Sequence, residues 1–383
     1  MRILHTSDWH LGRSFHRENL IEAQAAFVDH LIATVRAERV DVVAVAGDLY
    51  DRALPPVDAV ALFDDALARI RGTGAQAVLI SGNHDSLVRM AYGTRLMAAS
   101  GIHLCSSLGS VGTPVVIDHP RGPVAFYGIP YLEPEVVRHA WDLPDRSHKA
   151  AVGHAMDLVR ADLAARPAGT RSVVLSHAFV TGGEPSDSER DISVGGAAHV
   201  PVGVYDGVDY TALGHLHGRQ RMAHTVRYSG SPLAYSFSEE HQTKGYWLVD
   251  LDPGGAAHTE FVAAPVPRPV ARIRGRIESL LTDPAWERHT DHWLQVTLTD
   301  PARPAAPMER LRRRFPHTLN LAFDPDDGGP ADDRTWARRT AGRGEADLVR
   351  DFVDWARGTP ATAAEDRLIQ RAFEDIRTGE AAR

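Results

Sequence analysis

Val42-Val43-Ala44-Val45-Ala46-Gly47-Asp48-Leu49-Tyr50-Asp51 is the most informative run of the chain, because it joins an apolar segment directly to a carboxylate. The unbroken series of β-branched and small apolar residues predicts a strand buried on both faces, as in a sheet that has helices on each side. Gly47 then lets the backbone turn closely before Asp48. In open α/β sheets, ligands bind at the carboxyl ends of the strands. A single aspartate in this position is also typical of a turn, so its role depends on the other strands.

The segments around this run alternate between strand and helix patterns. Arg2–Thr6 and Gln76–Ile80 have the length and composition of strands, whereas Glu18–Arg39, Val57–Ile70 and Leu87–Ala99 have the patterns of helices. Strands that alternate with helices predict a largely parallel sheet. We therefore expect the residues that follow these strands to meet at one edge of the sheet.

Metal-binding side chains follow five of the predicted strands. Asp8 and His10 come after the first strand, and on an extended segment residues two apart point to the same side. The same spacing recurs in His215 and His217, which have glycines on both sides. The oxygen and nitrogen donors are Asp8, His10, Asp48, Asn83, His177, His215 and His217.

This mixture of donors predicts a site for two divalent metal ions. Carboxylate, amide and imidazole groups suit Mn²⁺, Fe²⁺ or Zn²⁺ better than Ca²⁺, which prefers oxygen ligands alone. The donors are too many for one ion, and two ions about 4 Å apart can share them through a bridging carboxylate. Asp48 follows the central strand and is the expected bridge. Such a pair of ions binds a phosphate ester and stabilises the attacking and leaving oxygens of an in-line displacement.

The order of these motifs resembles that of the calcineurin-like metallophosphoesterases. The motifs are Asp8-x-His10, Gly47-Asp48-x-x-Asp51, Gly82-Asn83-His84-Asp85, His177 and Gly214-His215-x-His217. The resemblance implies an α/β fold, a two-sheet sandwich flanked by helices. It implies a first metal held by Asp8, His10, Asp48 and His217. It implies a second metal held by Asp48, Asn83, His177 and His215.

His84 is predicted to be a catalytic group rather than a metal ligand. Asn83 and His84 are adjacent, and both side chains are not expected to reach one ion from a tight turn. The resemblance implies that His84 contacts the phosphate or protonates the leaving group, and that Asp51 orients it. Asp85 is the alternative partner of His84.

Further segments resemble a narrower group, the nuclease subunits that work with an ABC-type ATPase in bacteria. They are Leu4–Gly12, Gly47–Asp51, Ser81–Ser86, Arg190–Ile192, Ala212–His217 and Tyr228–Pro232. The chain departs from this group at Ser176, where Gly or Ala is more usual. The resemblance implies an Mn²⁺-dependent DNA exonuclease and hairpin endonuclease. It also implies an ATPase partner with a long coiled coil, and a homodimer within a heterotetramer.

Composition excludes some classes of protein and leaves others open. The net charge of -8 argues against a simple basic nucleic-acid-binding module, although bound metal ions would change the local charge. Cys105 is the single cysteine, which rules out an intrachain disulfide and fits a reducing compartment. The sequence starts without a signal peptide pattern and contains no membrane-length apolar run, so we expect a cytoplasmic protein.

The composition shifts near Ala264, where Pro265, Pro267 and Pro269 predict a linker. We therefore divide the chain into a metallophosphoesterase domain at 1–264, a small α+β capping domain at 265–330, and a linker with a helical tail at 331–383. The tail contains two apolar stripes at helical spacing, which predict docking to the ATPase. The stripe residues are Leu348, Phe352, Trp355, Leu368 or Ile369, Phe373 and Ile376.

Other interpretations of the sequence remain open. The same metal core would serve a phosphodiesterase or phosphatase that acts on a small nucleotide or a phosphoprotein. A scaffold that has lost catalysis would lack a ligand, and no expected ligand is missing. The arginines at 310 and 312–314 are interpreted as a solvated helix face, with contact to a DNA backbone as the alternative. Packing or surface roles are expected for His5, His103, His199 and His224.

Overall fold

The computed structural model describes residues 1–190, 192, 199–326, 344–357 and 359–381. The chain forms two compact units, Met1–Val270 and Ala271–Arg383. The predicted boundary at residue 330 lies outside the described residues, as does Asp191. Among the described helices, none combines the length and the apolar character that crossing a membrane requires.

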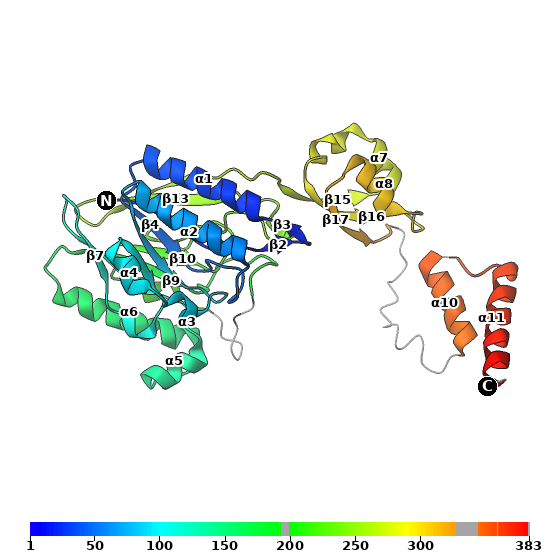
Figure 1. Cartoon of the computed structure of the whole chain (residues 1–383), viewed down its shortest axis with the longest axis horizontal. Coiled ribbons are helices and arrows are strands. Elements are labelled where there is room, and N and C mark those ends of the chain that lie inside the picture. Colours follow the sequence, from blue (N-terminus) through cyan, green and yellow to red (C-terminus); the bar gives the residue numbers. More distant parts are fainter. Residues whose placement is uncertain (191, 193–198, 327–343, 358, 382–383) are drawn as a thin grey trace. The chain divides into compact units, whose positions relative to one another are not determined.

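The first unit contains two six-stranded sheets (Figure 1). The first has the order β14 (Ala257–Ala263), β13 (Gly245–Leu251), β1 (Arg2–Thr6), β4 (Val42–Ala46), β5 (Gln76–Ile80), β6 (Ile102–Cys105). The second has the order β11 (Gln220–Arg221), β12 (Val226–Tyr228), β10 (Tyr210–Gly214), β9 (Arg171–His177), β8 (Val124–Ile129), β7 (Val115–Ile117). The central strands of each sheet are parallel, and β13, β14, β7 and β11 pair in antiparallel fashion.

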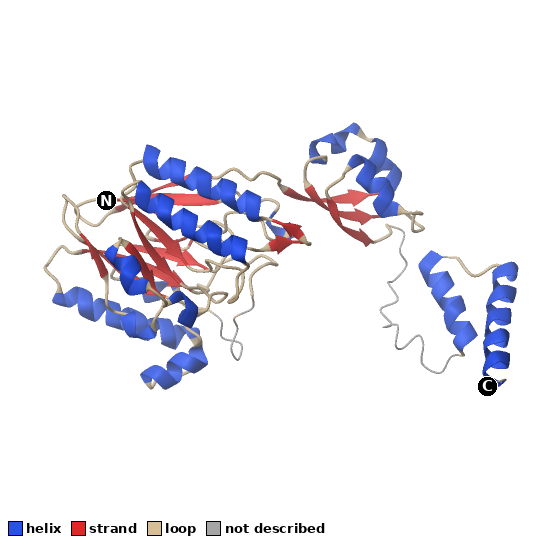
Figure 2. Ribbon diagram, in the orientation of Figure 1, coloured by secondary structure: helices blue, strands red, loops and turns tan. Residues whose placement is uncertain are grey.

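Helices cover the outer face of each sheet, and the two inner faces pack together (Figure 2). The helices α1 (Ile21–Ala37) and α2 (Val57–Gly72) lie on the first sheet, and α5 (Pro134–Trp141) and α6 (His148–Ala165) lie on the second. In β4, Val43 faces the helices while Val42 faces the other sheet. Both faces of this strand are therefore apolar, and the predicted two-sheet sandwich is confirmed.

Two of the predicted helices have different boundaries. The helix expected over Glu18–Arg39 begins only at Ile21, because Glu18–Asn19 forms β3, which pairs with β2 (Ser14–Phe15). The helix expected over 87–99 is divided into α3 (Leu87–Met90) and α4 (Thr94–Ala99). Gly93 separates them with φ +72°, a conformation that does not continue a right-handed helix.

The second unit contains a three-stranded sheet and two short α-helices that pack on it. The sheet has the order β15 (Val270–Gly275), β16 (Trp293–Leu298), β17 (Thr318–Phe323). The helices are α7 (Ile277–Thr282) and α8 (Pro307–Arg314), and their shared core includes Leu280, Leu294 and Phe315. These strands and helices give this region the α+β character that the sequence predicts.

The tail forms two helices, α10 (Glu345–Arg357) and α11 (Ala363–Ala381), as the sequence predicts. Arg350 of α10 pairs with Asp366 of α11, which joins the two helices. The side chains of Trp355 and Ile376 lie outside the described part of the tail. Short 3-10 helices complete the described elements: η1 (Leu108–Ser110), η2 (Val202–Tyr205), η3 (Phe237–Glu239) and η4 (Pro284–His289).

Candidate metal centre

The carboxyl ends of strands from both sheets meet at one place, and all seven predicted ligands lie there. The ring of His177, at the end of β9, reaches across to the first sheet, where its Nδ1 is 2.9 Å from the carbonyl oxygen of Ala46 in β4. On the first sheet, the amide of Asp8 donates to the carbonyl of Gly47 over 3.0 Å. These bonds bring the residues after β1, β4 and β9 together.

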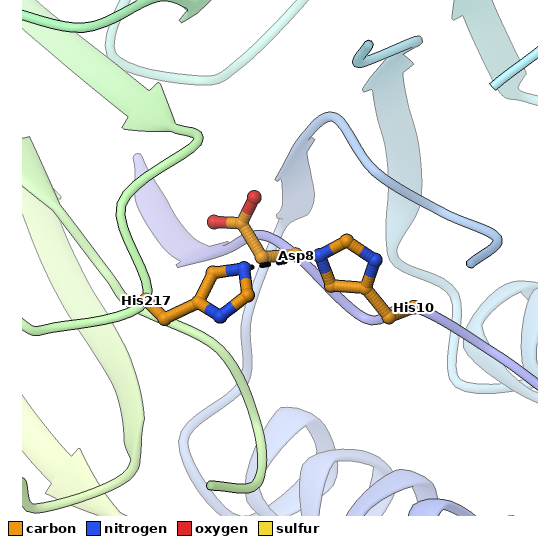
Figure 3. A group of neighbouring side chains, drawn as sticks. All are labelled: Asp8, His10 and His217. Carbon is orange, nitrogen blue, oxygen red and sulfur yellow. Dashed lines mark hydrogen bonds between the residues drawn. The ribbon is translucent and has the colours of Figure 1, made fainter. Parts of the chain in front are cut away.

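Asp8, His10 and His217 form the first group of candidate ligands (Figure 3). One ligand atom from each residue lies within 4.8 Å of the others. The Nε2 atoms of His10 and His217 face one another at 3.1 Å, as the dashed line in Figure 3 shows. Two imidazole nitrogens that converge in this way can share one cation.

Asn83, His177 and His215 form a second group. The Oδ1 atom of Asn83 is 3.0 Å from Nε2 of His177 and 3.2 Å from Nδ1 of His215. The amide of His215 donates to Asp8 Oδ1 over 3.0 Å, so the two groups share a backbone contact. This grouping is the one that the family resemblance implies for the second metal.

Asp48 lies between the two groups. Its Oδ2 atom is 3.5 Å from Nε2 of His10 in the first group and 3.5 Å from Nε2 of His177 in the second. Its Oδ1 atom accepts a hydrogen bond from the backbone amide of His84 over 2.9 Å. A carboxylate in this position has the geometry that a bridging ligand needs, and the bridging role itself stays a prediction.

The backbone is strained at four of the seven residues. Asp8, His10, Asp48 and His215 have φ values of +53°, +45°, +49° and +108°. Non-glycine residues seldom adopt such values, each costs roughly 1–3 kcal/mol, and they cluster at functional sites. The expectation that Asp8 and His10 lie on an extended segment is therefore wrong. The backbone turns at both, and the amide of His10 donates to the carbonyl of Asp48 over 2.9 Å.

Glycines at the strand ends make room for the side chains of the site. Gly47 has φ +93°, and a Cβ atom there would lie 2.3 Å from Nδ1 of His177. A Cβ atom on Gly214 would lie 1.9 Å from the carbonyl oxygen of Ala46. Neither position can hold a larger residue unless the two sheets move apart at the site.

The donor set fits divalent cations. Asp8 and Asp48 are buried, and carboxylates removed from water need compensating charge. Burial lowers the pKa values of His10 and His215 well below the ordinary value, so both rings are neutral and can donate a lone pair. Burial raises the pKa of Asp8 to about 6. The Nδ1 atom of His10 is buried with no hydrogen-bond partner among the described residues.

His84 lies beside the same cluster. Its Nε2 atom is 4.0 Å from Asp48 Oδ2, and its Nδ1 atom is 2.7 Å from the backbone carbonyl of Asp51. Asp51 thus contacts the ring through its main chain, whereas its carboxylate lies 3.5 Å from Arg13. The carboxylate of Asp85 accepts hydrogen bonds from the amides of Leu49, Tyr50 and Gly82.

Other polar residues that the sequence motifs did not reveal lie behind His217. Ser188 Oγ is 2.6 Å from His217 Nδ1, and Glu189 Oε1 accepts the backbone N–H of His217 over 2.7 Å. Glu239 and Lys244 form a buried ion pair beneath them. Ser188 lies in a loop 29 residues before His217, and no spacing rule connects the two.

The residues expected to have packing or surface roles include one clear structural case. His5 is buried between the sheets, 3.0 Å from the hydroxyl of Tyr210 and 3.1 Å from the carbonyl of Leu213. In the second unit, Arg312 donates to the carbonyl of Thr318 and Arg314 to that of Leu280. These two arginines therefore stabilise their own domain.

The chain resembles known protein families and solved structures. Residues 266–354 match the family described as the type 5 capsule protein repressor C-terminal domain. Among solved structures, the chain is similar to GAP50, the anchor in the inner membrane complex of Plasmodium. The two share 13% sequence identity and a TM-score of 0.43, and the match covers 86% of this chain and 99% of that chain. A dimetal phosphatase from Danio rerio shows 14% identity, TM-score 0.42 and coverage of 69% and 99%.

The amino-terminal match is broader. Residues 1–219 match the family described as calcineurin-like phosphoesterase. This region is more than half of the chain, and it contains all seven candidate ligands at the ends of its parallel strands. The chain belongs to the calcineurin-like phosphoesterase family.

Proposed function

We propose that this metal-dependent phosphoester hydrolase is a DNA nuclease of the SbcD type. It would act as an exonuclease and a hairpin endonuclease in DNA repair and recombination, together with an SbcC-like ABC-type ATPase. The observation that carries the proposal is the convergence of seven Asp, Asn and His side chains, six of them buried, on one site. The C-terminal match supports the choice within the family, because the short name of that domain refers to SbcD.

The two ions would be held by the groups described above, with Asp8, His10 and His217 on one side of Asp48 and Asn83, His177 and His215 on the other. When bound, such ions polarise the phosphoryl oxygens and lower the pKa of a bound water. We assign Mn²⁺ to this site and a cytoplasmic location to the protein, as the sequence predicts.

His84 would supply the proton for the leaving oxygen. The backbone carbonyl of Asp51 can only accept, so Nδ1 of His84 carries a proton and donates it to that carbonyl. This bond leaves Nε2 directed toward Asp48 and the metal cluster. Because Nδ1 already holds one proton, His84 would act as an acid only in its doubly protonated form, whose second proton, on Nε2, is the one placed to reach a substrate oxygen.

Exposed apolar side chains support the proposed partners. On α10 and α11, Phe352 is 51% exposed and Leu368 is 63% exposed, as expected for helices that dock on an ATPase. On α2 to α4, Val57, Val88 and Tyr92 are each at least 85% exposed. The elements that contain them follow the metal-binding loops, and such exposed side chains favour contact with a second copy of the chain.

The experiment that tests the function uses the purified full chain with Mn²⁺. Its substrates are linear duplex DNA, hairpin DNA and a small chromogenic phosphodiester, each with and without the ATPase subunit. We expect metal-dependent cleavage of all three, with ATP stimulation of duplex cleavage when the ATPase is present. Cleavage of the small diester without any cleavage of DNA would favour the alternative substrate class, a small nucleotide or a phosphoprotein.

A further inference from the structure

The ring of His217 has a hydrogen-bond partner on the side away from the metal cluster. Its Nε2 atom faces His10, and its Nδ1 atom is 2.6 Å from Ser188 Oγ. The same hydroxyl is 2.7 Å from Oε1 of Glu239 and 2.9 Å from the hydroxyl of Ser186. A carboxylate is the stronger acceptor, so the proton of Ser188 points to Glu239.

This arrangement determines which nitrogen of His217 carries the proton. A serine hydroxyl has one proton, and that of Ser188 is donated to Glu239. The oxygen of Ser188 must then accept from His217, so Nδ1 carries the hydrogen and Nε2 keeps its lone pair. This is the tautomer that a metal needs on the side facing His10.

Lys244 holds the other end of this chain of hydrogen bonds. Its Nζ atom lies 2.5 Å from Oε2 of Glu239, and both residues are buried. The same ammonium group donates to the backbone carbonyl of His217 over 2.9 Å and to Ser231 Oγ over 3.0 Å. Lys244 therefore bonds the backbone of His217 directly and is connected to its ring through Glu239 and Ser188.

We propose that Ser188, Glu239 and Lys244 are positioning residues for the metal ligand His217. They fix the tautomer and the orientation of its ring, so that Nε2 meets the ion held with Asp8 and His10. The proposal rests on the metal site of the proposed function but not on its DNA substrate. Outer-shell partners of this kind typically contribute roughly 10- to 100-fold to metal affinity.

The second group of ligands provides an internal comparison. His177 and His215 contact Asn83 through their rings, and neither ring contacts Ser188 or Glu239 in the described structure. Loss of the Ser188 hydroxyl is therefore expected to weaken the binding of one ion and to leave the binding of the other unchanged. A general loss of stability would weaken the binding of both ions.

The test compares four variants of the full chain with the wild type. Ser188→Ala removes the hydroxyl, Glu239→Gln removes the charge, and Ser188→Thr keeps a hydroxyl and should restore binding. Ser172→Ala is the matched control, because this serine also bonds a carboxylate, that of Asp209, but lies at the opposite end of β9 from His177. Each metal-free protein is titrated with Mn²⁺ by calorimetry and with Co²⁺ by visible absorption, and its thermal unfolding is recorded.

We expect Ser188→Ala and Glu239→Gln to weaken one of two metal equivalents by about tenfold or more and to change the Co²⁺ spectrum of that site. Ser188→Thr and Ser172→Ala should bind both equivalents as the wild type does. Normal affinity in Ser188→Ala, or an equal loss of both equivalents, would overturn the positioning role. A wild type that binds no ion contradicts the metal site itself, and one that binds two ions without cleaving DNA contradicts only the proposed substrate.

Discussion

Asp48 contacts both groups of candidate ligands, since its Oδ2 atom is equally distant from Nε2 of His10 and Nε2 of His177. We expect Asp48→Ala to abolish metal-dependent hydrolysis and to weaken binding of both ions, because one carboxylate would serve two cations. Asp64→Ala, an exposed position on α2, is the control. Metal analysis by mass spectrometry checks the prediction, and one tight ion per wild-type chain at saturating Mn²⁺ would contradict it.

His84 differs from the ligands in what its removal should do. His84→Ser should slow turnover by roughly a hundredfold or more, in the range for a lost general acid, while two ions remain bound. The reason is that Nε2 of His84 lies 4.0 Å from Asp48, at the edge of the cluster, and its ring is held by Asp51. Turnover and metal content are measured on the same preparation. If both fall together, His84 is a ligand.

His5 should make the fold sensitive to acid. Burial lowers the pKa of His5 to about 3, so the folded state holds a neutral ring that donates to Leu213 and accepts from Tyr210. The unfolded chain takes up a proton below its ordinary pKa of about 6.5, and stability is lost as the pH falls from there toward 3. Between pH 7.5 and 5.5 this residue should cost roughly 1.4 kcal/mol of the free energy of unfolding.

The measurement for His5 is urea unfolding of the metal-free protein at the two pH values. His5→Gln is less stable at both, because it loses contacts between the sheets, but its stability should change less with pH. The difference between the two proteins in how the free energy of unfolding changes with pH gives the contribution of His5 apart from that of the other histidines. Equal slopes in the two proteins would show that His5 does not carry the acid sensitivity.

At the scale of elements, the close approach of β4 and β10 depends on Gly214. A Cβ atom there would lie 1.9 Å from the carbonyl of Ala46, which also contacts the ring of His177. Gly214→Ala should therefore lower the free energy of unfolding by several kcal/mol and reduce metal affinity. Chemical denaturation and metal titration measure both effects.

The control for Gly214 is a glycine with open space around it. Gly153 lies inside α6, and nothing is within 4 Å of a Cβ atom placed there. Gly153→Ala should stabilise the protein by about 0.5–1 kcal/mol, because alanine is the better helix former. A Gly214→Ala protein as stable as the wild type would show that the sheets can separate at the site without cost.

Strands and their terminal polar residues could be predicted because both are local patterns. The apolar run of β4 and the donors after β1, β4, β5, β9 and β10 all lie where the sequence places them. The turned backbone at Asp8 and His10 could not be predicted from the sequence. It is imposed by hydrogen bonds from their backbone amides to the carbonyls of Gly47 and Asp48, which lie in another segment. The division of the helix at Gly93 could not be predicted either, because a single glycine inside an apolar helical pattern is often tolerated.

The partners of the ligands were also beyond the reach of sequence patterns. Ser188, Glu239 and Lys244 approach His217 only because the loop of Ser188, the 3-10 helix η3 and the residue before β13 meet at the segment that follows β10. No periodicity connects a loop serine with a histidine far along the chain. Ligands follow strands and can be read from motifs, whereas the residues that orient them come from tertiary packing.

At the scale of the whole molecule, the tail should be separable from catalysis. Deleting residues from Gly344 onward removes α10 and α11, which pack on each other through Arg350 and Asp366. The shortened protein should fold, bind two ions and cleave a small phosphodiester. It should lose co-purification with the ATPase and ATP-stimulated cleavage of duplex DNA, because the docking helices are absent.

Point variants complement this deletion. Phe352→Ala and Leu368→Ala remove exposed apolar groups and should weaken ATPase binding without loss of helix content. Pull-down with the ATPase subunit and circular dichroism measure the two properties. A shortened chain that aggregates, or that binds the ATPase with full affinity, would assign the tail to the fold of this chain instead.

The contacts of Lys244 also connect His217 to the end of the first domain. The amide of Ala264, where the first unit passes into the proline-containing linker, donates to the carbonyl of Lys244 over 2.9 Å. Tension applied to the chain beyond Ala264 is therefore borne first by the residue whose side chain holds the carbonyl of His217. The candidate ligand His217 lies two contacts from Ala264, so a force that pulls on the linker would reach the candidate metal site through Lys244.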